Sequence, residues 1–363
     1  MEILIGITFK NWMKLLFRHR RDIPLSQTGK IINLTIMSIF RNSYYCAREK
    51  KEFARAIRNV TVHSAPVFVL GHWRSGTSHL HRLLTLGEHF TYPTVFDIYS
   101  PHSFLYTEPM LRERMNRAES QMRPMDNMKI AYNDPGEDEF ALAVMTLMSP
   151  LLAWVFPKQT AFYDRYLSFE DIPETEIALW REQFLHLLKK LTVRQNRPVI
   201  LKSPQHTSRI KLIREMFPDA RFIHIHRNPY TVYQSTVKLY EKTVAPMQIS
   251  APLSKTAMHE GIIRRYADMY KTFLEQKETI PSENFIEVSY EALDKQPEKV
   301  IESIFNHFQF DSFENYRPLL KNHLNDIGTY TKNVHKPIEQ PWLEKINREW
   351  DFAFKAWQYD KES

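Results

Sequence analysis

Residues 66–86 read PVFVLGHWRSGTSHLHRLLTL, and this stretch decides the fold of the chain. Four apolar residues, 67–70, follow Pro66 and predict a short strand that is buried on both faces. Gly71 ends this strand, and leucines at helical spacing after Ser75 predict a helix. Such a strand, loop and helix N-terminus predict an anion-binding site. The N–H groups of the loop and first turn converge there, and the helix dipole favours negative charge.

The loop has the spacing of a phosphate-binding loop but lacks one of its residues. Gly71 and Gly76 enclose four residues, and Thr77 stands where the Walker motif has lysine. The nearest cation is Arg74, inside the loop. The chain has eight glycines, and two of them lie in this loop, which indicates close approach of the backbone to a ligand. The pattern predicts phosphate binding and argues against a nucleoside triphosphatase, which needs the lysine.

The composition narrows the classes of protein to consider. With 363 residues, 43% of them hydrophobic, the chain can bury a large core. The single cysteine, Cys46, excludes an intrachain disulfide and a cysteine-rich metal site, and we predict no metal. The formal charge of +7 favours an anionic partner, but 42 acidic residues against 49 basic ones argue against a nucleic-acid binder. No apolar run approaches a membrane span and no secretory leader is recognised, so we expect a cytoplasmic protein.

Residues 1–60 have a helical pattern and form a predicted N-terminal extension. Residues 3–17 are apolar with interspersed lysines and end in the basic run 18–21, and a second helical run spans about 31–57. Two interpretations of the first helix stay open. It packs on the domain as an amphipathic helix, or it makes a peripheral contact with an anionic membrane surface. We predict that residues 61–363 form one domain.

Three further strand-like runs follow, each leading into a helical pattern, at residues 198–201, 221–226 and 284–288. Strands that alternate with helices predict an α/β fold with a central parallel sheet between two layers of helices, like that of P-loop proteins. In such sheets ligands bind beyond the carboxyl ends of the strands. Arg74, Lys202 and Arg227 all follow strand ends, so we predict that three cations meet at one edge of the sheet.

These residues resemble the motifs of sulfotransferases that use 3′-phosphoadenosine 5′-phosphosulfate (PAPS), in particular the bacterial branch with arginine in its first motif. The family's 5′-phosphosulfate loop reads Lys/Arg-Ser-Gly-Thr-Thr/Ser and is matched by Arg74, Ser75, Gly76, Thr77 and Ser78. Its 3′-phosphate motif is an arginine after a strand with a serine eight residues later, matched by Arg227 and Ser235. The resemblance covers residues 66–86 and 198–310. It implies a P-loop-like fold, PAPS as sulfonate donor, and adenosine 3′,5′-bisphosphate as product.

The resemblance also implies roles for these residues. Arg74 would stabilise charge on the leaving oxygen, the loop would hold the 5′-phosphate, and Arg227 with Ser235 would hold the 3′-phosphate. Lys202 is a further candidate for binding the phosphate or the sulfonate. The sequence departs from the cytosolic relatives in two respects: it lacks their Arg-Lys-Gly segment, and it has no histidine in their catalytic context.

An acidic cluster, Glu137-Asp138-Glu139, is the candidate source of the catalytic base. Relatives of the arginine type often use a glutamate to take the acceptor's proton. Asp134 suits a helix N-cap and Pro135 the first helical position, so we predict that all three acids lie in the first turn. The alternative for each acid is that it complements the helix dipole.

Glu137 is the first candidate for the base and Glu139 the second, with His102 and Asp97 in reserve. A given histidine among the 15 in the chain is more often structural than catalytic.

The predicted function is transfer of a sulfonate group from PAPS to a hydroxyl or amine of a small-molecule, lipid or glycan acceptor. An insertion at about residues 92–170 is rich in apolar and aromatic residues and is expected to shape the acceptor pocket. Two alternatives stay open. One is a nucleotide kinase or hydrolase with a degenerate P-loop, and the other is a non-catalytic anion- or membrane-binding protein.

Overall fold

The computed structural model describes residues 3–117, 121–122, 129–327 and 337–362. The chain divides into two compact units, each built from segments that are distant in the sequence. Unit 1 comprises Met1–His63, Thr91–Val199 and Lys242–Leu253, and unit 2 comprises Ser64–Phe90, Ile200–Glu241 and Ser254–Ser363. The division at residue 60 stays a prediction. Parts of the predicted insertion, residues 118–120 and 123–128, lie outside the described residues.

Unit 2 contains a parallel sheet of four strands in the order β4–β1–β5–β6. The strands are β1 (Val67–Leu70), β4 (Ile200–Lys202), β5 (Arg221–His226) and β6 (Phe285–Ser289). All four residues of β1 are buried, as expected for a central strand with both faces covered. The predicted strands are confirmed to within two residues at their ends. Because all four run in one direction, their carboxyl ends share one edge of the sheet.

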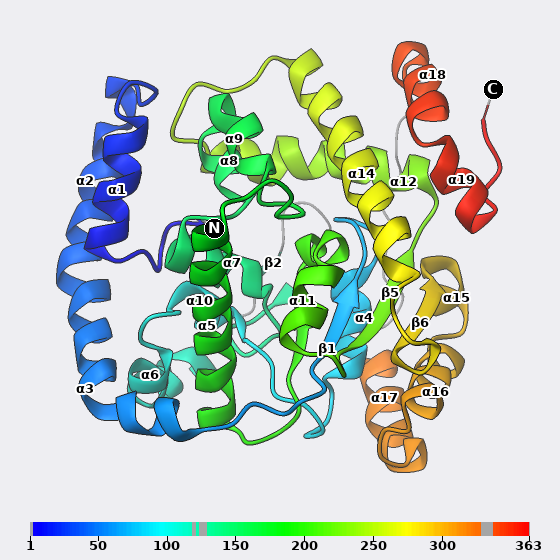
Figure 1. Cartoon of the computed structure of the whole chain (residues 1–363), viewed down its shortest axis with the longest axis horizontal. Helices are drawn as coiled ribbons and strands as arrows, with labels where there is room; N and C mark the ends of the chain where they lie inside the picture. The colour runs from blue at the N-terminus through cyan, green and yellow to red at the C-terminus, as the bar shows by residue number, and fades with distance from the viewer. Residues whose placement is uncertain (1–2, 118–120, 123–128, 328–336, 363) are drawn as a thin grey trace. The chain divides into compact units, whose positions relative to one another are not determined.

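Helices cover both faces of this sheet. Because side chains alternate along each strand, neighbouring residues of one strand contact helices on opposite faces. On β5, the ring of His224 lies 4.1 Å from that of Phe273 in α14 (Lys255–Lys277). The next residue, Ile225, faces the other side, toward Gly76 at the start of α4 (Thr77–Leu84). Figure 1 shows these helices around the strands. The predicted α/β fold with a central parallel sheet is confirmed.

The other helices of unit 2 pack around an aromatic core. The rings of Tyr266 and Trp350 stack at 3.7 Å, and Tyr270 packs edge-on against Trp357 at 4.7 Å. The helical elements are η4 (Pro204–Ser208), α11 (Ile210–Met216), α12 (Pro229–Leu239), η6 (Ser282–Asn284), α15 (Tyr290–Lys295), α16 (Pro297–Phe308), α17 (Phe313–Ile327), α18 (Gln340–Glu349) and α19 (Asp351–Trp357).

Unit 1 is mainly helical, which confirms the helical N-terminal extension. Its elements are α1 (Phe9–His19), η1 (Leu25–Gln27), α2 (Thr28–Met37), η2 (Ser38–Ser43), α3 (Tyr44–Asn59), α5 (Val95–Tyr99), α6 (Phe104–Arg117), β2 (Gln121–Met122), β3 (Lys129–Ile130), α7 (Asp138–Thr146), α8 (Leu152–Val155), η3 (Pro157–Gln159), α9 (Thr160–Asp164), α10 (Glu174–Arg194) and α13 (Ala245–Met247). A turn of π-helix, η5 (Tyr240–Val244), joins the last residues of α12 to α13.

A buried ion pair fixes the long helix α10 to the N-terminal helices of unit 1. Nζ of Lys190 lies 2.5 Å from Oε1 of Glu49 in α3, and both side chains are buried. Lys190 also donates a hydrogen bond to the carbonyl of Pro101. Removing one member of such a pair leaves a buried charge and is strongly destabilising.

The prediction that α7 begins at Asp134 and Pro135 is wrong, because the helix begins at Asp138 with Glu137 as its N-cap. The carboxylate of Asp134 instead accepts a hydrogen bond of 2.7 Å from the N–H of Ala131 and closes a turn. Two of the three predicted acids therefore lie in the first helical turn. No helix within the described ranges is both long enough and apolar enough to cross a bilayer.

Candidate functional site

The backbone of the loop after β1 requires glycine at both ends. Gly71 has φ +146° and Gly76 φ +101°, values that residues with a side chain rarely adopt. A Cβ atom at Gly71 would lie 2.5 Å from the carbonyl oxygen of Ile225, and one at Gly76 would lie 2.4 Å from the ring of Tyr290. The loop therefore passes in direct contact with the ends of β5 and β6, and any side chain at these positions would force it away.

Side chains from distant segments hold the first part of this loop. The N–H of Gly71 donates to Oγ1 of Thr207 at 2.8 Å, and the N–H of His72 donates to the hydroxyl of Tyr270 at 3.0 Å. Burial lowers the pKa of His72 to about 3, so its ring is neutral at pH 7. The sequence analysis missed Thr207 and Tyr270. They lie 136 and 198 positions from their partners, and no local pattern marks such contacts.

Ser75 makes two hydrogen bonds within the loop. Its N–H and its hydroxyl both donate to the carbonyl of His72, at 3.1 and 2.8 Å. These hydrogen bonds shape the loop, and the predicted part of Ser75 in binding the donor stays a prediction. The preceding residue, Arg74, has φ 72°, a strained left-handed conformation for a residue with a long side chain. Such strain is typical of functional loops that the surrounding structure holds in place.

The predicted cations converge on the loop, as expected from strand ends that share one edge. Nε of Arg74 donates to Oγ of Ser235 at 2.9 Å, and Nη1 of Arg227 donates to the carbonyl of Arg74 at 3.3 Å. Nζ of Lys202, at the end of β4, donates to Oγ of Ser78 in the first turn of α4 at 3.1 Å. The structure therefore brings together residues of the two predicted binding motifs.

This assembly favours an anionic ligand. The N-cap of α4 is Gly76, which has no side chain to cap the helix, and the first turn contains no acidic residue. The N–H groups of that turn, together with three nearby cations, match a ligand that carries more than one phosphate or sulfonate group. The glycines let the loop pack directly against Ile225 and Tyr290, which holds the N-terminus of α4 in place.

A hydrogen-bonded chain that reaches the C-terminal residues holds the segment after Arg227. Oε1 of Glu291 accepts from the N–H of Asn228 at 3.2 Å, and Oε2 accepts from the hydroxyl of Tyr359 at 2.7 Å. The side chain of Asn228 caps α12. The guanidinium of Arg227 lies 3.9 Å from the ring centroid of Tyr290. Burial lowers the pKa of Arg227, although a guanidinium stays ionised at neutral pH.

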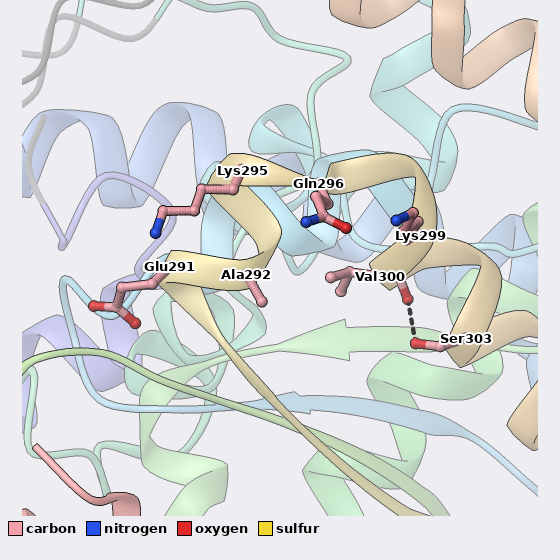
Figure 2. A pocket seen from close by; sticks show the side chains of 7 residues that line it. All are labelled: Glu291, Ala292, Lys295, Gln296, Lys299, Val300 and Ser303. Carbon is pink, nitrogen blue, oxygen red and sulfur yellow. Dashed lines mark hydrogen bonds between the residues drawn. The ribbon is translucent and has the colours of Figure 1, made fainter.

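A shallow cavity of about 320 Å³ lies at the corner between α15 and α16. Figure 2 shows its lining residues, Glu291, Ala292, Lys295, Gln296, Lys299, Val300 and Ser303. Ser303 donates to the carbonyl of Val300, so its hydroxyl is used within α16. None of the eight predicted donor-binding residues lines this cavity, and we assign it no part in donor binding.

Comparison with known proteins identifies the chemistry. The sulfotransferase family matches residues 66–315. The chain is 32% identical over 358 residues to the omega-hydroxy-beta-dihydromenaquinone-9 sulfotransferase Stf3 of Mycobacterium bovis and of Mycobacterium tuberculosis. This match covers 98% of the chain and 91% of each relative. The chain belongs to the sulfotransferase family. It is an enzyme, and the group that it transfers is a sulfonate.

Solved structures confirm the fold of this sulfotransferase. Sulfotransferase STF1 of Mycobacterium tuberculosis superposes with a TM-score of 0.65 at 17% identity, over 87% of each chain. Sulfotransferase STF9 of Mycobacterium avium superposes with a TM-score of 0.66 at 18% identity, over 89% of this chain and 83% of its own. At these identities the likeness concerns the fold, which is the predicted P-loop-like α/β fold.

The candidate bases of the sulfotransferase belong to unit 1. Glu137 is half-buried, and its side chain makes no capping hydrogen bond to α7, although it occupies the N-cap position. Asp138 and Glu139 are completely buried in the first turn of the helix. The assignment of Glu137 as first candidate for the base, and of Glu139 as second, stays a prediction.

The two reserve candidates, His102 and Asp97, make contacts with other residues of unit 1. Burial lowers the pKa of His102 to about 3, and its ring hydrogen-bonds to the backbone of Val144, which makes it a weak base at neutral pH. Oδ2 of Asp97 accepts from the N–H of Thr94 at 2.8 Å and pairs with Arg194 at 2.5 Å. These contacts assign Asp97 to holding α5 on α10.

Proposed function

We propose that this sulfotransferase takes its sulfonate group from PAPS and transfers it to a hydroxyl group of a largely apolar small molecule. PAPS supplies a sulfonate whose S–O bond to the 5′-phosphate breaks as a new bond forms from sulfur to the acceptor oxygen. The observation that supports PAPS is the convergence of Arg74, Lys202 and Arg227 at the uncapped N-terminus of α4. Two motifs in contact suit a nucleotide with phosphates at both ends of its ribose.

The parts of the site divide between the two ends of the donor. The N–H groups of the first turn of α4, with the hydroxyls of Thr77 and Ser78, hold the 5′-phosphate, and Lys202 adds a charge next to Ser78. Arg227 and Ser235 hold the 3′-phosphate, which distinguishes this donor from ATP. Ser75 keeps the loop in shape through its two hydrogen bonds to His72.

Arg74 acts on the charge that develops in the transition state. Sulfuryl transfer resembles phosphoryl transfer in having a loose transition state, so positioning and electrostatic stabilisation supply most of the catalysis. A guanidinium with a pKa above about 12 cannot serve as a proton donor, so Arg74 stabilises the leaving phosphate oxygen as a fixed positive charge. Its left-handed backbone conformation and its contact with Ser235 hold the side chain beside the loop.

The acceptor hydroxyl must lose its proton as the new bond forms, and we assign that proton to Glu137, with Glu139 as the alternative. Glu137 is half-buried, whereas Glu139 is completely buried, so a bound acceptor can reach the carboxylate of Glu137 more easily. His102 is third, because a base whose pKa is about 3 holds a proton poorly at neutral pH.

The relatives support the acceptor class that we propose. Stf3 is named for an omega-hydroxylated menaquinone derivative, a lipid-like alcohol. We propose a terminal hydroxyl on an apolar chain or ring as the acceptor here, consistent with the apolar insertion of unit 1. A glycan or an amine acceptor is the alternative that an acceptor screen distinguishes.

The test is a transfer assay with 35S-labelled PAPS and a panel of apolar alcohols, sugars and amines. We expect label to transfer to the apolar alcohols and the product nucleotide to appear in equal amount. Thermal-shift measurements with PAPS alone and with ATP plus Mg²⁺ are the control, and we expect PAPS to raise the Tm of the protein. Stabilisation by ATP plus Mg²⁺ without stabilisation by PAPS would refute the assignment of PAPS as donor.

A further inference from the structure

The first helices of unit 1 expose an unusual amount of apolar surface. Nine of the thirteen large hydrophobic side chains that are exposed in the described part of the chain fall between residues 9 and 44. The most exposed are Leu25 at 92%, Phe40 at 73% and Phe17 at 70%. Single exposed apolar residues are ordinary, but a contiguous group marks an interaction surface.

This surface belongs to helices that are firmly packed on their other side. Trp12, Leu15 and His19 of α1 are buried, and the ring of His19 stacks on Phe156 at 4.1 Å. The expectation that the first helix packs on its domain is therefore confirmed for one face. The exposed residues form a second face of the same helix, which the packing does not use.

Two hydrogen bonds show that α1 runs antiparallel to α2 and to η2, the π-helix that directly follows α2. The N–H of Phe9 donates to Oγ of Ser43 at 3.0 Å, and Nε1 of Trp12 donates to Oγ1 of Thr35 at 2.8 Å. The two helices lie side by side in Figure 1. Trp12 and Thr35 therefore mark the sides on which the helices face each other.

The helices α1 and α2 form a helical hairpin, and their exposed apolar residues point to the same side of it. On each helix they stand three positions before and one position after the contact residue, namely Phe9 and Met13 on α1, and Ile32 and Ile36 on α2. These offsets place them about 60° and 100° around each helix from the contact, in the same sense. Because the helices are antiparallel, equal rotations about the two axes turn side chains to the same side of the hairpin.

Basic residues border the apolar ones. Lys10, Lys14 and Arg18 each follow an exposed apolar residue of α1 by one position, about 100° further around the helix. Residues 3–48 contain eight lysines and arginines and one acidic residue, Asp22. The carboxylate of Asp22 accepts a hydrogen bond from Gln159, so it is turned to the unit's own residues.

We propose that this surface, here called the N-terminal face and defined by Phe9, Met13, Phe17, Leu25, Ile32 and Phe40 with the flanking basic residues, docks on the surface of a bilayer that contains anionic lipid. The apolar side chains enter the boundary between headgroups and acyl chains, while the lysines and arginines reach the anionic headgroups. The hairpin lies in the plane of the interface and does not cross the bilayer.

The charge decides between a membrane and a second copy of the chain. Two such faces brought together would oppose one strongly basic surface to another, which is repulsive. An anionic bilayer supplies both the apolar depth and the opposite charge, each basic residue near the surface contributing to binding. This inference is independent of the proposed donor and acceptor, since it concerns residues outside both predicted motifs.

The test is sedimentation of the full chain with vesicles, in the absence of donor and acceptor. Vesicles of phosphatidylcholine alone are compared with vesicles that also contain phosphatidylglycerol. We expect binding to the anionic vesicles, falling as salt is added because exposed charges are screened. The variant Phe17→Ser/Leu25→Ser/Phe40→Ser is expected to lose this binding. The pair Met110→Ser/Leu179→Ser, which removes exposed apolar residues elsewhere in unit 1, is expected to keep it.

A charge variant keeps the test decisive if the serine variant fails to fold. Replacing Lys10 and Lys14, both exposed, by alanine is expected to weaken binding by about fivefold per lysine. Three results would overturn the proposal: no binding of the unmodified protein to anionic vesicles, equal binding by the triple variant, or a dimer in solution that the triple variant abolishes.

Discussion

Nε of Arg74 donates a hydrogen bond of 2.9 Å to Oγ of Ser235, a residue 161 positions away in the sequence. This bond joins the loop after β1 to α12, and therefore joins the two motifs that resemble the 5′- and 3′-phosphate motifs of sulfotransferases. Arg227 adds a second link, because its guanidinium donates to the carbonyl of Arg74. Two hydrogen bonds thus join the two ends of the proposed donor site.

The first prediction concerns the grip on the 3′-phosphate. Replacing Arg227 and Ser235 by alanine is expected to weaken the binding of adenosine 3′,5′-bisphosphate, because charged hydrogen bonds are lost. Each loss costs about 1.5–3 kcal/mol, or about tenfold to over a hundredfold in affinity. The binding of adenosine 5′-phosphate serves as the control in calorimetry and is expected to change little. Equal losses for both nucleotides would disprove the assignment.

The second prediction follows from the contact between Arg74 and Ser235. The single variants Arg74→Ala and Ser235→Ala and the double variant form a cycle for the affinity of the product nucleotide. Residues in contact show interaction energies of about 0.5–3 kcal/mol in such cycles. We therefore expect the loss of binding free energy in the double variant to differ from the sum of the two single losses by at least about 0.5 kcal/mol. Additive effects, measured by calorimetry, would mean that the contact has no energetic weight.

The third prediction separates catalysis from binding at Arg74. If the guanidinium acts in the transition state, Arg74→Ala lowers kcat far more than it raises the KM for PAPS. Arg74→Lys is expected to restore part of the rate, because it keeps the charge. Because the proposed charge stabilisation comes from Arg74, Lys202 and the N–H groups of α4, we expect full activity in excess EDTA. A raised KM with unchanged kcat would assign Arg74 to binding.

Much of the fold and of the donor site could be predicted because both are encoded locally. The apolar runs mark the strands, and parallel strands bring Lys202 and Arg227 to the edge where the loop lies. The contributions of Thr207, Tyr270 and Tyr359 could not be predicted, because each acts through a hydrogen bond to a residue far away in the sequence.

Local signals failed where a competing contact was stronger. Asp134 and Pro135 look like the start of a helix, yet the carboxylate of Asp134 closes a turn onto Ala131 and the helix begins at Asp138. For Ser75 the motif gave no sign of its hydrogen bonds to the carbonyl of His72. In both cases the residue type was informative, while the partner was set by the tertiary structure.

The fourth prediction concerns stability in acid. Burial lowers the pKa of His19 to about 4 from an ordinary value of 6.5. Between these values the unfolded chain binds more protons than the folded one, so stability falls as the pH drops from 6.5 toward 4. His72 and His226, with pKa values of about 3 and 4, act in the same direction. Calorimetry at pH 5.5 is therefore expected to show proton uptake on unfolding.

A pair of variants assigns part of this effect to one residue. His19→Phe keeps an aromatic ring against Phe156 and removes the titrating group, so Tm should depend less on pH between 6.5 and 4. His63→Phe makes the same substitution at an exposed position and is the matched control. The same dependence in His19→Phe and in the unmodified protein would rule out this origin.

The last prediction tests the catalytic base. Glu137→Gln keeps the shape of the side chain and removes its basicity, so transfer should be abolished while the affinity for adenosine 3′,5′-bisphosphate is retained. The acidic limb of the kcat profile against pH should disappear with it. Glu174→Gln is the matched control, because Glu174 is an exposed acid in the first turn of α10 and pairs with Arg181. If the carboxylate of Glu137 only complemented the helix dipole, Glu137→Gln would change kcat as little as Glu174→Gln does. If Glu137→Gln retains near-normal kcat, the proton goes elsewhere, and Glu139→Gln is the next variant to measure.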